Sequence, residues 1–78
     1  MNIVSELSEP KELYAFGDPY RLMLSEKLSR GTEMIDIRNY VRWNTDHQYH
    51  PGSNGLMIEK DLFINTILPK LNKIFNIT

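Results

Sequence analysis

Alternating apolar and polar residues from Glu33 to Trp43 constrain this chain more than any other feature of its sequence. Successive side chains of a strand point to opposite faces, so the alternation predicts a strand that is apolar on one side and polar on the other. The apolar side would carry Ile35, Ile37, Val41 and Trp43, and the polar side Met34, Asp36, Arg38, Tyr40 and Arg42. Guanidinium groups and aromatic rings are the side chains that grip phosphates and stack on planar groups. We therefore look for a functional site on a sheet surface rather than in a pocket.

A second alternating segment precedes the first and predicts its partner strand. From Tyr20 to Ser29, leucines share one face with Tyr20, while Arg21 and Lys27 lie on the other. The intervening Arg30-Gly31-Thr32 favours a tight reversal, so the two segments are expected to form an antiparallel hairpin whose polar faces merge.

Shorter signals complete the expected sheet. Residues 13–16 are rich in aromatic residues and precede the turn signal Gly17-Asp18-Pro19, so they predict a short strand. The polar stretch 44–54 predicts a long loop, and 56–58 a brief closing strand. Residues 1–12 mix serine, glutamate and proline, which favours a loosely ordered acidic arm with helical turns around 4–7. The fold class is thus α+β, with a four-stranded antiparallel sheet and a carboxy-terminal helix in one domain over 13–78.

The period changes to that of a helix from Glu59 onward. Apolar residues recur every three or four positions, at Phe63, Ile64, Ile67, Leu68, Leu71, Ile74 and Phe75. This stripe is broader than a small sheet can cover, so part of it is expected to pack on the same helix of a second copy. Pro69 cannot donate a hydrogen bond to the Asn65 carbonyl, which predicts a kink or a break near Leu68.

Length and composition favour the same assembly. A chain of 78 residues has a marginal core, and without cysteine it has no disulfide to reinforce it, so we expect a homodimer. The net charge is −1, but the basic residues gather in the middle of the chain. The acidic amino terminus does not resemble a signal peptide, and no apolar run is long enough to span a bilayer, so we expect a soluble, intracellular protein.

Two segments carry a resemblance to a known family. The run from Ile35 to Tyr40 reads Ile-Asp-Ile-Arg-Asn-Tyr, and the run from His50 to Gly55 reads His-Pro-Gly-Ser-Asn-Gly. In this order, followed by a short strand and a helix, they resemble the single-stranded-DNA-binding domain of the transcription coactivator family called positive cofactor 4. That family has Ile-Asp-Ile-Arg-Glu-Tyr and then Lys-Pro-Gly-x-Lys-Gly, and the resemblance spans residues 14–75.

The resemblance implies a curved four-stranded sheet, a homodimer with packed helices, and channels for unpaired DNA. It implies no enzymatic activity and no cofactor. The compact chain looks like a bacterial or bacteriophage version acting in replication, recombination or transcription, in the cytoplasm of a bacterium or infected cell, or in the nucleus of a eukaryote. The implied nucleic-acid-binding residues are Arg21, Lys27, Arg30, Arg38, Tyr40, Arg42, Trp43 and His50, and the implied dimer interface is Phe63, Ile64, Ile67, Leu68, Leu71, Ile74 and Phe75.

This chain departs from the family pattern at several positions. The tryptophan stands two residues later, at Trp43, and alternation points it toward the core unless the strand ends or bulges there. His50 and Asn54 replace the two loop lysines, and the stacking phenylalanine near the first turn has no equivalent. These changes remove positive charge and are expected to lower affinity.

Other readings of the same residues stay open. Asp36 is expected to orient Arg38 or Lys27, since the sequence fixes no second catalytic group beside it. His47 and His50 lie in a loop without a further strong ligand, which disfavours a metal site. RNA or melted duplex is an alternative ligand, since stacking and phosphate contacts do not require a particular sugar. The alternative function is a protein-interaction module that recruits replication or transcription proteins and binds nucleic acid weakly.

Overall fold

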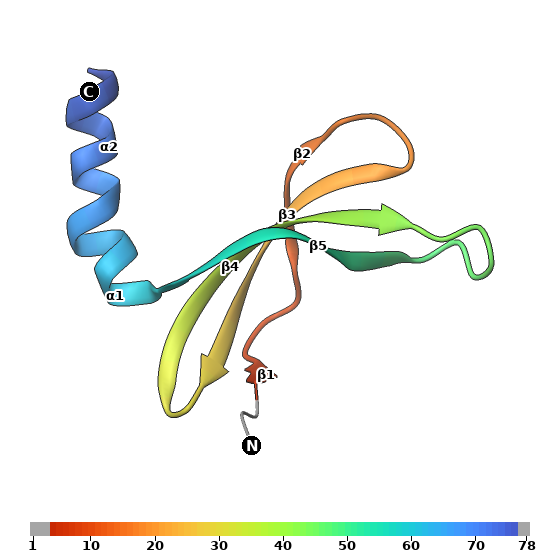
Figure 1. Cartoon of the computed structure of the whole chain (residues 1–78), viewed down its shortest axis with the longest axis horizontal. Helices are drawn as coiled ribbons and strands as arrows, with labels where there is room; N and C mark the ends of the chain where they lie inside the picture. Colours follow the sequence, from red (N-terminus) through yellow and green to blue (C-terminus); the bar gives the residue numbers. More distant parts are fainter. Residues whose placement is uncertain (1–3, 77–78) are drawn as a thin grey trace.

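The computed structural model describes residues 4–76 and has an α+β fold, an antiparallel sheet followed by a carboxy-terminal helix (Figure 1). This fold class confirms the expectation from the sequence. The structure has five strands where the sequence predicted four, and their order across the sheet is β1-β3-β4-β5, with β2 also paired to β3. They are β1 (Val4–Glu6), β2 (Lys11–Ala15), β3 (Tyr20–Ser29), β4 (Thr32–Arg42) and β5 (Tyr49–Glu59).

The β3–β4 hairpin is the longest unbroken pairing in the sheet. Its register runs without a shift from Ser29 opposite Thr32 to Tyr20 opposite Val41. The two turn residues, Arg30 and Gly31, both have positive φ angles, 53° and 79°. A two-residue turn of this kind matches the twist of the flanking strands, so the predicted hairpin is confirmed with its reversal at the expected place.

Two short strands share the outer edge of β3. β1 pairs with its final residues, from Val4 opposite Ser29, and β2 pairs with its first half, ending with Ala15 opposite Arg21. The prediction of helical turns around residues 4–7 is therefore wrong. Backbone pairing explains the strand, since the edge of β3 offers unpaired amide and carbonyl groups and the Leu7 amide also donates to the Glu26 carbonyl at 2.8 Å.

The loop after β4 is shorter than predicted, because β5 begins at Tyr49. Residues 49–54, expected to belong to that loop, lie within β5, and 49–51 of them pair with β4, so only 43–48 connect the two strands. The pairing shifts register between Arg38, opposite Gly55, and Tyr40, opposite Pro51. This bulge absorbs the intervening polar residues, so proline and glycine are accommodated without ending the strand.

The sheet is a thin layer with few fully buried side chains. In the described part of the chain the buried apolar residues are Ile35 and Tyr40, and the buried polar ones are Ser25 and Asp36. Side-chain alternation separates a cationic face from an apolar face bearing Leu24, Ile35, Ile37, Leu56 and Ile58. Leu56 is exposed on that apolar face, so a single copy leaves part of it uncovered.

The carboxy-terminal helix is continuous but irregular. It comprises α1 (Lys60–Leu62), a π-helical segment η1 (Phe63–Ile67) and α2 (Leu68–Phe75), and Asn76 ends it with a left-handed conformation. The Leu68 amide donates to the Phe63 carbonyl, a bond five residues long. The irregularity expected near Leu68 thus takes the form of a π turn immediately before Pro69, whose missing N–H interrupts the ordinary helical ladder.

The helix stands away from the sheet in Figure 1 and meets it through its first turn. There the Lys60 ammonium donates to the Glu26 carboxylate, and Glu33 lies 3.8 Å from the same ammonium. Most apolar residues of the predicted stripe are exposed in a single copy. Phe63 and Ile67 are half-buried, and the exposed residues are Ile64, Leu68, Leu71, Ile74 and Phe75. No helix within residues 4–76 is long and apolar enough to cross a bilayer.

Candidate nucleic-acid interface

One face of the β3–β4 hairpin collects most of the predicted site. Arg21 lies opposite Tyr40, and Lys27 lies opposite Met34, so the unshifted register puts the odd-numbered residues of β3 on the same face as the even-numbered residues of β4. We call this the cationic face, and it is made by Arg21, Lys27, Arg38, Tyr40 and Arg42. Sequence alternation predicted this grouping, and the register brings these residues together.

A buried carboxylate holds the centre of the cationic face. Asp36 is 1% exposed. The Lys27 ammonium donates to its Oδ2 at 2.6 Å, and the Arg38 Nε lies 2.9 Å from Oδ1 and 3.0 Å from Oδ2. Asp36 therefore orients both Lys27 and Arg38, where the sequence left the choice between them open, and it offsets part of their positive charge.

Arg38 is also fixed by the bulged strand beside it. Its Nη1 donates to the Gly52 carbonyl at 2.9 Å. Gly55 leaves room for this arrangement, because a Cβ at that position would lie 2.2 Å from the Arg38 Cβ and 2.8 Å from its Cζ. Within the described residues, the bonds that hold Arg38 use its Nε and Nη1.

Tyr40 is part of the core rather than an open ring. It is 7% exposed, and desolvation by burial raises the pKa of its phenol. The sequence predicted a ring that either stacks on bases or packs on the surface as an exposed cross-strand partner. In this conformation its ring is covered, so the cationic face offers charge without a stacking platform at this position.

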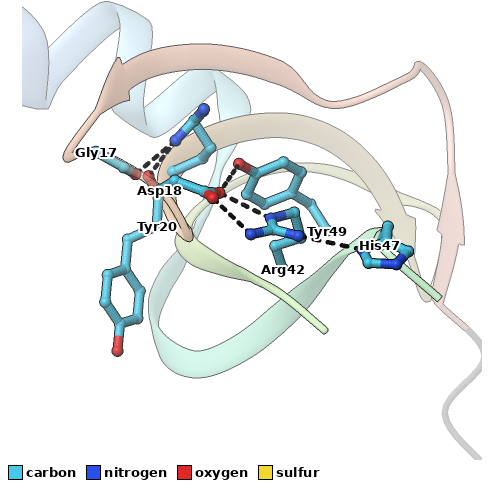
Figure 2. A network of polar contacts seen from close by, with 7 residues as sticks. Gly17, Asp18, Tyr20, Arg42, His47 and Tyr49 are labelled. Atoms are coloured by element: carbon cyan, nitrogen blue, oxygen red, sulfur yellow. Dashed lines mark hydrogen bonds and ion pairs between the residues drawn. The ribbon is translucent and has the colours of Figure 1, made fainter. Parts of the chain in front are cut away.

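At the outer end of the cationic face, Asp18 and His47 from two turns meet Arg42 and Tyr49 at the ends of β4 and β5, and we call this group the turn cluster (Figure 2). Asp18, between β2 and β3, accepts hydrogen bonds from Arg42 Nε at 2.8 Å and Nη2 at 2.5 Å, and from the Tyr49 hydroxyl at 3.2 Å. The remaining Arg42 nitrogen, Nη1, lies 3.3 Å from Nδ1 of His47. The Arg42 hydrogen bond lowers the pKa of Asp18, and the same bond raises the pKa of Arg42.

Arg21 completes the turn cluster and is held by several groups. Its Nη1 donates to the Gly17 carbonyl at 2.6 Å and the Tyr20 carbonyl at 2.8 Å. Its Nε lies 3.1 Å from a carboxylate oxygen of Glu12, and its guanidinium lies 4.9 Å from the Tyr49 ring centre. The predicted cation is therefore present on the expected face, but it is already engaged with backbone and acidic partners.

Trp43 and His50 form a stacked pair on the opposite face. Their ring centres are 3.6 Å apart at an interplanar angle of 23°, and Trp43 is 51% exposed just beyond the end of β4. Nε2 of His50 lies 2.7 Å from Oδ2 of Asp46. A hydrogen bond from the Gln48 backbone N–H lowers the pKa of Asp46, and the hydrogen bond with His50 lowers it by a smaller amount. His50, predicted as a nucleic-acid contact, thus backs the indole ring.

The last predicted cation lies at the far end of the hairpin from the turn cluster. Arg30 lies in the β3–β4 turn, at the end of the hairpin opposite to the turn cluster. A strand rises by about 3.3 Å per residue, so roughly 30 Å separate Arg30 from Arg21 along β3. The predicted cations therefore extend along the hairpin rather than forming a compact pocket.

Sequence reasoning missed several residues that shape this surface. Asp18 was seen as a turn signal and Glu12 as part of the acidic arm, yet both pair with cations of the face. Tyr14 and Phe16 are exposed on and just after β2, with ring centres 5.0 Å apart. The aromatic richness of that segment was visible in the sequence, whereas its exposure was not.

Residues 4–76 contain no group of three or more histidine, cysteine, aspartate or glutamate side chains that could hold a metal ion. No family model, no curated protein and no solved structure matches the chain.

Proposed function

We propose that this protein is a non-enzymatic, homodimeric single-stranded-DNA-binding protein of the kind that its sequence resembles, similar to positive cofactor 4. It would act in replication, recombination or transcription with little dependence on base sequence. The observation that carries this proposal is the row of Arg21, Lys27, Arg38 and Arg42 on one face of two adjacent strands. Such a row can follow a line of phosphates, which is the feature common to all single strands.

Stacking would come from the end of the sheet, where Trp43 lies on the face opposite to the arginine row and a bound single strand would pass around the end of β4 to reach it. Trp43 is exposed and backed by His50, so a base can lie on its outer side without first displacing a core residue. A stacked base is worth about 1–3 kcal/mol as judged by alanine substitution. Tyr40 supports the sheet in this proposal, since its ring is covered.

A second copy would cover the exposed helix. Leu68 and Leu71 are exposed on a helix that meets the sheet through its first turn, and full burial of one such side chain contributes about 1.5–3 kcal/mol. Two helices packed together would remove these residues from water and give the small core the reinforcement it lacks. The homodimer is thus supported by what one copy leaves uncovered.

The proposal is tested by fluorescence anisotropy with labelled single-stranded and duplex oligonucleotides over a series of salt concentrations. The wild-type protein should prefer the single strand, and affinity should fall as salt rises. Arg38→Gln should weaken binding and reduce the slope of log affinity against log salt by about one. Lys70→Gln, which removes a charge from the exposed helix, is the matched control and should change neither value. Equal affinity for duplex and single strand, with no effect of Arg38→Gln, would refute the proposal.

One observation favours the alternative function, a protein-interaction module. Tyr14, Phe16 and the neighbouring Leu13 are exposed on and just after β2, where exposed apolar side chains can meet a partner protein. This reading predicts that Tyr14→Ser abolishes capture of a replication or transcription protein while oligonucleotide binding stays weak. The anisotropy experiment separates the two functions directly.

A further inference from the structure

The turn cluster is built like a receptor for an oxyanion. Arg42 approaches the Asp18 carboxylate with two nitrogens, at 2.8 and 2.5 Å, and the Tyr49 hydroxyl adds a third donor at 3.2 Å. A paired arginine fork with a hydroxyl is suited equally to a carboxylate and to a phosphate, since both present oxygens at matching spacing. The receptor is at present filled by a side chain of the same protein.

The bound carboxylate is accessible. The Asp18 side chain is 57% exposed and that of Arg42 27% exposed, so an anion from solution can reach the pair. The sheet holds Arg42 and Tyr49 opposite each other on β4 and β5. Figure 2 shows Asp18 approaching them from the neighbouring turn.

The turn that carries Asp18 is closed without its carboxylate. The Tyr20 amide donates to the Gly17 carbonyl at 3.0 Å, and the Phe16 amide to the Tyr20 carbonyl at 3.2 Å. The Arg42 amide donates to the Pro19 carbonyl at 2.9 Å, which ties the turn to β4. Because these bonds involve only backbone atoms, the Asp18 side chain can rotate away while the turn keeps its shape.

We propose that Asp18 is an internal competitor that occupies a phosphodiester subsite formed by Arg42 and Tyr49. The inference rests on the proposed function, because the phosphodiester is that of the bound single strand. The bound DNA strand displaces the Asp18 carboxylate from Arg42, so each complex forms only after the Asp18–Arg42 ion pair has been broken. Affinity is held below the value that the arginine row alone would give, which favours release and rebinding over permanent coverage.

The test compares Asp18→Asn with Glu9→Gln in anisotropy titrations of a labelled oligothymidylate. Both variants remove one negative charge, but Glu9 is an exposed residue between β1 and β2 and lies outside the turn cluster. Asp18→Asn should raise affinity about fivefold or more and steepen the salt slope by about one, since one further phosphate contact forms. Glu9→Gln should change affinity less than twofold, and Arg42→Gln added to Asp18→Asn should remove the gain. Far-ultraviolet circular dichroism checks each fold, and Asp18→Ser replaces Asp18→Asn if the latter does not fold.

The outcomes separate this inference from the proposed function. If the wild-type protein binds the oligonucleotide and Asp18→Asn gains no more than Glu9→Gln, Asp18 only pins the turn, and the inference is overturned while the function stands. If the wild-type protein binds no oligonucleotide, the proposed function fails, and inorganic phosphate is titrated while the Arg42 Nε–H signal is followed by nuclear magnetic resonance. A phosphate-dependent shift in Asp18→Asn that is larger than in wild type supports the receptor, and equal or absent shifts overturn it.

Discussion

Replacing Asp36 with asparagine should destabilise this protein more than any exposed charge replacement. The variant keeps the size of the side chain but leaves Lys27 and Arg38 without the carboxylate that both contact. Removing one member of a buried ion pair costs about 3–5 kcal/mol, because the remaining charge is left uncompensated. Here the two cationic side chains are 16% and 22% exposed, so water can reach them in part. We therefore expect a smaller loss, about 2–3 kcal/mol.

Urea denaturation measures this loss. At a slope of about 1–2 kcal/mol per molar urea, the midpoint should fall by roughly 1–3 M without a change in slope. All variants must be compared at one chain concentration, since the stability of a dimer depends on it. Glu9→Gln is the control for the loss of one exposed charge and should stay within about 0.5 kcal/mol of wild type.

A double-mutant cycle then identifies the source of the effect. Lys27→Met alone leaves the Asp36–Arg38 contact in place, so it should cost less than Asp36→Asn. Combined with Asp36→Asn, it should restore part of the lost stability, since one uncompensated cation has been removed. If Asp36→Asn is no less stable than Glu9→Gln, the buried carboxylate does not hold the centre of the sheet, and our account of its role is wrong.

Three further predictions address other parts of the molecule. Gly55→Ala should cost about 1–3 kcal/mol in thermal or urea unfolding, because the new methyl group would lie 2.2 Å from the Arg38 Cβ. Leu71→Asp should give the mass of one chain in light scattering where wild type gives twice that mass, since a charge would enter the proposed helix interface, and an unchanged mass would contradict this interface. The Arg42 hydrogen bond lowers the pKa of Asp18, so its contribution to stability is present above about pH 5 and lost as pH falls through the lowered pKa; Asp18→Asn should therefore lose less stability between about pH 5 and 2 than wild type.

The strands with alternating residues could be predicted from the sequence because their signal is local. β3 and β4 alternate over most of their length, and the Arg30-Gly31 turn fixes their register. β5 was missed because Pro51 and Gly52 resemble loop residues, while the bulge that accommodates them depends on pairing with β4. β1 has no pattern of its own and forms by pairing with a strand more than twenty residues later in the chain.

Part of the candidate site could also be predicted, because the alternation signal is local. Alternation placed Lys27, Arg38 and Arg42 on one face, since the face of a strand residue follows from its position. It could not reveal that Asp18 pairs with Arg42, because this contact joins a turn residue to the end of a strand 24 residues later in the chain. It also could not reveal the burial of Tyr40, which depends on how the rest of the chain covers that part of the face.

The division of the outer edge between β1 and β2 has a consequence for behaviour at high concentration. A long uninterrupted edge strand is a template on which further chains can add by backbone pairing. This edge ends instead in two short strands separated by residues 7–10, and the opposite edge strand contains Pro51 within its bulged half. Neither border of the sheet offers a full-length template, so the protein is protected from fibril-like growth even though much of its apolar surface meets water.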